Sequence, residues 1–154
     1  MLLLTMKNKT IIRNQNGGAA VEFAIILPLF IFLLFGIIEG GLLLYNQHII
    51  TNASREGARA GIIAAVPKVT DQEIRDKVKD YARRFLVTFS SDTLEDENIN
   101  ILPAYSTRNN AGAFGTDLVV DVTYNYDFLS LFNPITFKKF DGVPLEARTV
   151  MKME

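Results

Sequence analysis

The sequence contains no cysteine and a single histidine, His48. Without thiols the chain can form neither a disulfide nor a thiolate metal site, and one imidazole excludes a site built from several histidines. His48 has no second metal-ligating side chain in view, so we interpret it as a surface histidine. A Ser/His/acid set, a phosphate-binding glycine loop and paired catalytic carboxylates are also missing. We therefore expect no metal, no cofactor and no enzymatic activity.

Charge is scarce in the first third of the chain. Between Arg13 and Arg55 the only charged residues are Glu22 and Glu39, whereas residues 1–17 carry three basic residues and no acid. Cations ahead of an apolar run favour the cytoplasmic side of a membrane. Without those three of the 16 basic residues, the 17 acidic residues predominate, which argues against nucleic-acid binding.

A long apolar run follows the basic segment and ends near Tyr45. It is about 23 residues long, which at about 1.5 Å per helical residue matches a bilayer core of roughly 30 Å. A cleaved secretory signal has a shorter core, of about 7 to 15 residues. The run therefore predicts a basic leader at residues 1–17, with Met6 as an alternative start, and a transmembrane helix at 18–45.

The helix is expected to run from about Ala19 to about Ala65, with an extracytoplasmic extension at 46–65. Pro28 should kink it, because its ring displaces a backbone hydrogen bond, and Pro67 should break it. A second helix begins at a capping box formed by Thr70 and Glu73. Its apolar stripe consists of Ile74, Val78, Tyr81, Ala82, Phe85 and Leu86, and its cations Lys77, Lys79, Arg83 and Arg84 face away.

After residue 97 the apolar period changes from 3.6 to 2. Apolar residues alternate with others over residues 99–105, over 120–126 and, less cleanly, over 145–153. Residues 107–116 are rich in Asn and Gly and indicate a loop. We therefore predict an α+β domain at 70–154: an amphipathic helix followed by an antiparallel sheet of about three strands. Phenylalanines over 128–140 are interpreted as core, with contact to membrane or partner as the alternative.

Two glycines and an acid mark the start of the apolar run: Gly17, Gly18 and Glu22. Glycine has no side chain, so a protease can approach the backbone closely there. A carboxylate within a membrane segment is costly, and its default interpretation is functional. Two plainer interpretations stay open. Gly17-Gly18 can be a flexible turn, and Glu22 can be an acid favoured by the helix dipole.

A second candidate region lies beyond the predicted membrane segment. Arg55 and Arg59 share a helix face, Glu56 lies beside them, and Gly57 begins a series of small residues that permits close helix contact. The functional interpretation is a packing surface for the sheet or for a partner. The alternative is a solvated helix with a weak ion pair.

Four segments together carry a family resemblance, namely Gly18–Leu29, Phe35–Glu39, Leu43–Asn46 and Asn52–Gly61. In these segments the chain resembles the TadE family, minor pseudopilins of the tight-adherence (Flp pilus) secretion system. The resemblance implies that a prepilin peptidase cuts between Gly17 and Gly18. It also implies that Glu22, followed by Phe23, meets the new α-amine of a neighbouring subunit, and that Pro28, Glu39, Arg55, Glu56, Gly57 and Arg59 serve subunit packing.

One position departs from the family pattern. Relatives commonly place an aromatic and then a basic residue soon after the acid corresponding to Glu39, whereas Gly40, Gly41 and Leu42 follow here. Glu39 therefore lacks a cation at i+3 or i+4. It is expected either at the outer membrane interface or paired with another subunit.

Taken together, the resemblance implies a pseudopilin of the inner membrane, with a cytoplasmic N-terminus and an extracytoplasmic domain. Its expected partners are a prepilin peptidase, other pilins or pseudopilins and the pilus assembly platform, and its expected role is assembly of a Flp type IVb pilus and surface adhesion. Two alternatives stay open: an uncleaved membrane-anchored interaction domain of the cell envelope, and an anchored extracytoplasmic enzyme.

Overall fold

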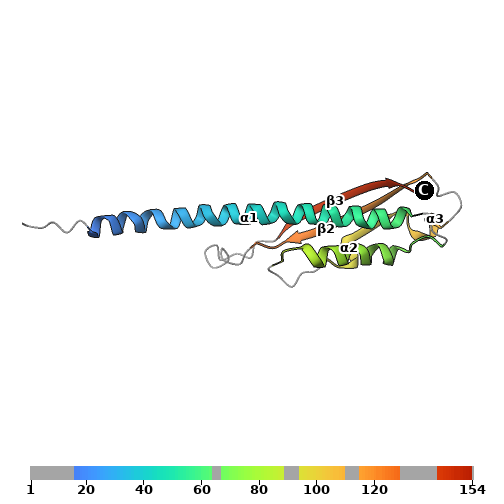
Figure 1. Cartoon of the computed structure of the whole chain (residues 1–154), viewed down its shortest axis with the longest axis horizontal. Coiled ribbons are helices and arrows are strands. Elements are labelled where there is room, and N and C mark those ends of the chain that lie inside the picture. Colours follow the sequence, from blue (N-terminus) through green and yellow to red (C-terminus); the bar gives the residue numbers. More distant parts are fainter. Residues whose placement is uncertain (1–15, 64–66, 89–93, 110–114, 129–141, 154) are drawn as a thin grey trace, which may run out of the picture. The chain divides into compact units, whose positions relative to one another are not determined.

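The computed structural model describes residues 16–63, 67–88, 94–109, 115–128 and 142–153. The chain divides into two compact units, Met1–Ile37 and Ile38–Glu154. Its elements are, in order, α1 (Asn16–Ile62), α2 (Asp71–Phe85), a 3-10 turn η1 (Asp96–Asn98), β1 (Ile99–Leu102), α3 (Tyr105–Arg108), β2 (Asp117–Tyr126) and β3 (Val143–Lys152) (Figure 1). The predicted α+β fold, with a long apolar helix, a second helix and an antiparallel sheet, is confirmed.

Helix α1 begins and ends slightly earlier than the predicted range, and it continues through Pro28 as one helix. In the first unit most of its large apolar side chains are exposed: Val21, Phe23, Ile25, Ile26, Leu29, Phe30, Ile31, Phe32, Leu33, Leu34 and Ile37. A helix of a water-soluble domain covers its apolar face, whereas this one is apolar and mostly exposed. Its length and composition are those of a single-pass membrane anchor.

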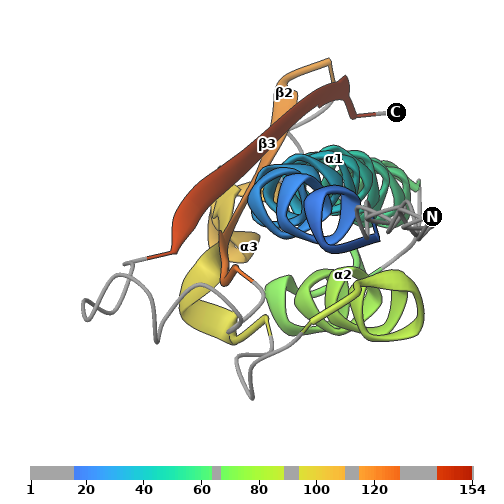
Figure 2. The ribbon, with the colours of Figure 1, turned by 90° about the vertical axis from the view of Figure 1, so that its left-hand side faces the viewer.

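In the second unit, three strands form an antiparallel sheet in the order β1-β2-β3. Val120, at the centre, pairs with Ile101 of β1 and with Thr149 of β3. Alternate side chains of β2 are buried, from Leu118 to Tyr126, as the period-2 pattern predicts. Helix α2 and the later turns of α1 cover this buried face (Figure 2).

Helix α2 starts at the predicted capping box. The Glu73 amide donates to the Thr70 hydroxyl (3.2 Å), and the Glu73 carboxylate accepts from the Thr70 amide (2.8 Å). Ile74, Val78 and Ala82 are fully buried. The predicted stripe is wrong at Phe85, which is 45% exposed because it lies in the last turn, with its ring against that of Tyr81 at 4.9 Å.

Strand β1 is shorter than predicted and ends at Leu102. Pro103 has no N–H to donate to the ladder, and the chain turns there into α3, where the Tyr105 amide donates to an Asp71 carboxylate oxygen at 3.0 Å. Residues 105–108 are thus helical, where the alternation predicted strand and the Asn/Gly content predicted loop. Of the phenylalanine-rich segment only Phe128 lies inside the described residues; it packs edge-on to Tyr126 at the margin of the core.

Candidate processing and packing sites

The residues of the predicted cleavage site lie in the first two turns of α1. Gly17 and Gly18 are exposed and helical, and a Cβ at either would meet no atom within 4 Å. Glu22 and Phe23 are exposed one turn later. The first turn of α1 contains no acid, so Glu22 lies where the dipole effect has largely decayed. This placement weakens the dipole interpretation of Glu22.

Glu39 has a partner within its own chain. Its side chain is buried, and the Tyr126 hydroxyl donates a hydrogen bond of 2.9 Å to its Oε1. Burial, and then the bond to Glu39, raises the pKa of Tyr126 far above its usual value, so the hydroxyl retains the proton that it donates. From the sequence, Glu39 was expected either at the outer membrane interface or paired with another subunit. Neither expectation included the hydrogen bond from Tyr126 of the same chain.

Polar side chains on the buried face of α1 fasten it to the rest of the second unit. The Asn46 amide donates to the Val87 carbonyl (2.7 Å) and accepts from the Val87 N–H (3.1 Å). The Ser54 hydroxyl donates to the Val120 carbonyl and lies 2.8 Å from the Thr149 hydroxyl. Sequence reasoning missed both residues. Asn46 and Ser54 lie four residues before and after Ile50, on the same face of the helix. A polar side chain on an apolar helix face needs a hydrogen-bond partner, and this spacing could have identified both residues.

The run from Arg55 to Gly61 separates into two faces. Gly57, Ala58 and Gly61 are buried, whereas Arg55, Glu56 and Arg59 are exposed. A Cβ built on Gly57 would lie 2.4 Å from Val78 Cγ2 of α2, and one on Gly61 would lie 2.4 Å from Leu118 Cδ2 of β2. The small residues therefore pack against the chain's own α2 and sheet. The exposed charges form no ion pair with the residues that the structure describes.

Substituting Gly57 by Ala should destabilise the second unit. The new methyl group overlaps Val78, whose β-branched side chain cannot rotate away freely, and such overpacking costs about 1–3 kcal/mol. Gly41→Ala is the matched control, because a Cβ there meets nothing within 4 Å. Both variants gain the same helix propensity, so the difference between their free energies of unfolding in detergent measures the packing effect. Equal stabilities would contradict the close contact.

A buried ion pair connects the start of α2 to α3. Arg108 is fully buried, and its Nη2 contacts Asp71 Oδ1, whose side chain is 24% exposed. The other Asp71 oxygen accepts from the Tyr105 amide. Within the described residues, Arg108 Nε and Nη1 have no hydrogen-bond partner. No sequence pattern marks this pair, because Arg108 falls in a stretch whose composition indicates a loop.

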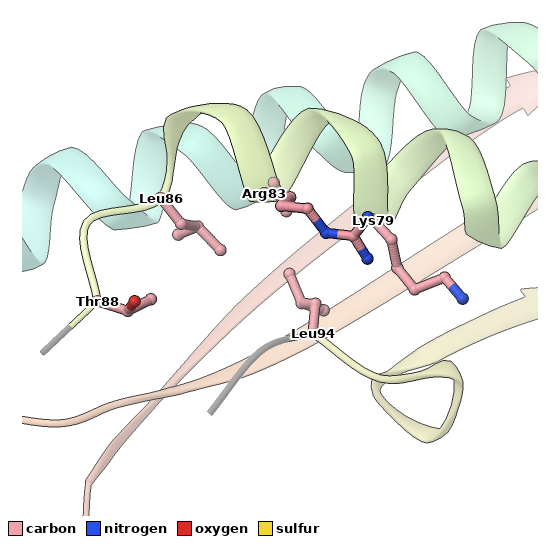
Figure 3. Close-up of a pocket in the computed structure, with 6 residues that line it drawn as sticks. Lys79, Arg83, Leu86, Thr88 and Leu94 are labelled. Atoms are coloured by element: carbon pink, nitrogen blue, oxygen red, sulfur yellow. The ribbon is translucent and has the colours of Figure 1, made fainter. Parts of the chain in front are cut away.

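Two hollows flank α2 near its C-terminal end. One, of about 180 Å³, is lined by Lys79, Ala82, Arg83, Leu86, Thr88 and Leu94 (Figure 3). The other, more open and of about 450 Å³, is lined by Glu56 of α1 with Lys77, Asp80, Tyr81, Arg84 and Phe85. Neither lining contains a nucleophile next to a base. No group of three metal-ligating side chains occurs among the residues that the structure describes, and His48 is exposed.

The fold and these sites define a class: an α+β domain carried on one long apolar helix compatible with a single-pass membrane anchor. The family model described as TadE-like protein matches residues 17–59. Over that segment the chain is similar to TadE-like proteins, which agrees with the resemblance that its residues indicated. Comparison with curated proteins and with solved structures found no match.

Proposed function

We propose that this chain is a minor pseudopilin of a Tad-type pilus, trimmed after Gly17 and then active in pilus assembly and adhesion. The match to the TadE family carries the proposal, because it begins at Gly17 and includes both Glu22 and Glu39. Such a protein is a structural component and a substrate of the peptidase. The exposed apolar surface of the first unit supports a membrane location, both before and during assembly.

The local structure favours trimming at this position. Gly17 and Gly18 occupy the first turn of α1, where backbone N–H groups lack intrahelical partners. Each glycine in a helix costs about 1 kcal/mol relative to alanine, so this turn opens easily into the extended form that proteases bind. Neither glycine contacts a side chain that opening would disturb.

We propose that the part of α1 that crosses the hydrocarbon core ends just before Glu39. From Gly18 to Ile38 α1 has about 21 residues, or about 31 Å, which equals the hydrocarbon core. From Glu39 onward the second unit covers α1, with Glu39 buried under Tyr126 and with Leu42 and Leu43 packed against the core. Residues 39–45, within the predicted span of 18–45, then lie among the headgroups. The Tyr126 hydroxyl stabilises the one acid at this boundary.

Gly17→Ala is expected to block trimming in cells that contain the prepilin peptidase. The methyl group both intrudes at the scissile backbone and stabilises the first helical turn. N-terminal sequencing or intact mass of the membrane protein gives the result: wild type begins at Gly18, and the variant keeps its leader. Gly36→Ala, also exposed and helical, is the control and should be trimmed normally.

The same measurement decides between the proposal and its alternative. If wild type keeps its leader with the peptidase present, the chain is an uncleaved membrane-anchored interaction domain. If it begins at Gly18 only when the peptidase is present, the pseudopilin assignment is supported.

A further inference from the structure

The C-terminal end of α2 lies beside Asn46, near the start of the part of α1 that belongs to the second unit. The two hydrogen bonds between Asn46 and Val87 fix this position, since Val87 follows α2 directly. Asn46 is eight residues beyond Ile38, so it is about 12 Å along the helix from the end of the apolar run. The headgroup layer on each side of a bilayer is about 5–8 Å thick. The last turn of α2 is therefore within side-chain reach of the lipid surface.

Exposed apolar side chains occur close to this contact in the sequence. Beyond Ile38, the large apolar residues that are clearly exposed in the described chain are Leu44, Tyr45, Ile63, Phe85, Leu102 and Val150. Three of them, Leu44, Tyr45 and Phe85, lie next to the Asn46–Val87 contact in the sequence. Tyr81, whose ring is tilted against that of Phe85, adds a second aromatic ring on α2. Aromatic rings at this position favour the membrane interface.

Basic side chains accompany these rings. Arg83 and Arg84 are exposed in the last turn of α2 and point to different sides of the helix. Arg84 Nη2 contacts Asp80 Oδ2 at 2.6 Å, in a pair that is more than half exposed and therefore weak. Arg83 borders the small hollow (Figure 3). Arginine has a long apolar stem and a guanidinium that binds phosphate, so it can bind headgroups from this distance.

We propose that Arg83, Arg84 and Phe85, with Tyr81 and Tyr45, form a second membrane contact that binds anionic phospholipid headgroups. This inference rests on the proposed membrane span. The contact restrains the domain at the bilayer surface, so that α2 and the helical anchor share one membrane. Its ligand is the lipid phosphate, with the ring of Phe85 lying at the headgroup layer. A protein partner at the same patch is the competing outcome.

The test uses the absence of tryptophan from the chain. Phe85→Trp places a single fluorophore in the patch of the full-length protein, reconstituted in nanodiscs of phosphatidylcholine with or without phosphatidylglycerol. We expect a blue-shifted emission and strong quenching by lipids that carry a nitroxide near the headgroup. Gln72→Trp, exposed at the other end of α2, should remain unquenched. Far-UV circular dichroism checks that each variant is folded.

Charge dependence identifies the ligand chemistry. One basic residue near an anionic lipid surface favours the lipid-bound state by about fivefold. Adding both Arg83→Gln and Arg84→Gln to the Phe85→Trp protein should therefore lower the ratio of lipid-bound to unbound patch by about 30-fold. Quenching of the indole fluorescence should fall accordingly in anionic nanodiscs. Quenching that is unchanged by the arginine substitutions overturns headgroup binding. So does protection of the indole that arises only when another pilus protein is added.

A further variant separates failure of this inference from failure of the membrane span. Phe30→Trp places the fluorophore within the exposed apolar part of α1, where nitroxides deep in the acyl region should quench it. If the Phe30→Trp protein is quenched while the Phe85→Trp protein behaves like the Gln72→Trp protein, the second contact is wrong and the span stands. If the Phe30→Trp protein is not quenched, the span itself is wrong.

Discussion

Substituting Asp71 by Asn is expected to lower the free energy of unfolding of the second unit by about 3 kcal/mol. The change leaves Arg108, which is fully buried, without a counter-charge. It also weakens the acceptor that receives the Tyr105 amide, so the attachment of α3 to α2 loosens. Guanidinium unfolding in a mild detergent, followed by circular dichroism, measures the loss.

Asp80→Asn is the matched control on the same helix. Asp80 and Arg84 form an exposed pair, and such pairs contribute about 0–1 kcal/mol. The buried pair should also respond asymmetrically. Arg108→Met removes the buried charge and leaves Asp71 24% exposed to water, so it should cost less than Asp71→Asn. If Asp71→Asn and Asp80→Asn are equally mild, the ion pair contributes nothing to stability.

The elements with a clear period were predictable from sequence alone. The capping box of α2 combines two local signals, at Thr70 and Glu73, and no distant residue is needed to interpret them. The alternation in β2 reports one buried face, and it extends from Leu118 to Tyr126 as observed. The approximate length of α1 was predicted from the apolar run and the break expected at Pro67, and the observed helix ends at Ile62 instead of near Ala65.

The predictions failed where a contact between distant segments decides the outcome. Tyr126 lies 87 residues from Glu39, and Arg108 lies 37 residues from Asp71, so neither pair leaves a local pattern. Strand β1 ends where the chain turns at Pro103 into α3. Helix α3 is held by the hydrogen bond from the Tyr105 amide to Asp71 of α2, and this contact is not visible in the local sequence. Phe85 has the correct helical phase for burial, but it lies where α2 ends.

The candidate site was predictable to a different extent. The two faces of the run from Arg55 to Gly61 follow from helical spacing, but spacing does not identify the neighbour. The small residues contact the chain's own α2 and β2, which accounts for Gly57 without a second subunit. A role for Arg55, Glu56 and Arg59 in subunit packing stays a prediction. Their exposure leaves them available for it.

Substituting Glu22 by Ala should abolish or strongly reduce pilus assembly while leaving trimming after Gly17 intact. Glu22 is an exposed acid within an apolar helix, and an unpaired carboxylate there is costly. Under the proposed function, trimming creates an α-amine at Gly18, and the ammonium group of a neighbouring subunit neutralises the carboxylate inside a low-dielectric bundle of helices. Counting surface pili by electron microscopy, together with the mature N-terminus, separates the two steps.

Glu56→Ala is the control for this experiment, because Glu56 is an exposed acid on the same helix but within the second unit. If Glu22→Ala abolishes piliation and Glu56→Ala does not, the effect is due to the loss of the acid inside the apolar segment. Glu22→Gln distinguishes charge from hydrogen bonding, since an amide keeps an acceptor but cannot neutralise an ammonium group. Normal piliation with both Glu22 variants would rule out the pairing, because an amine left unpaired in lipid should block assembly as effectively as an unpaired acid.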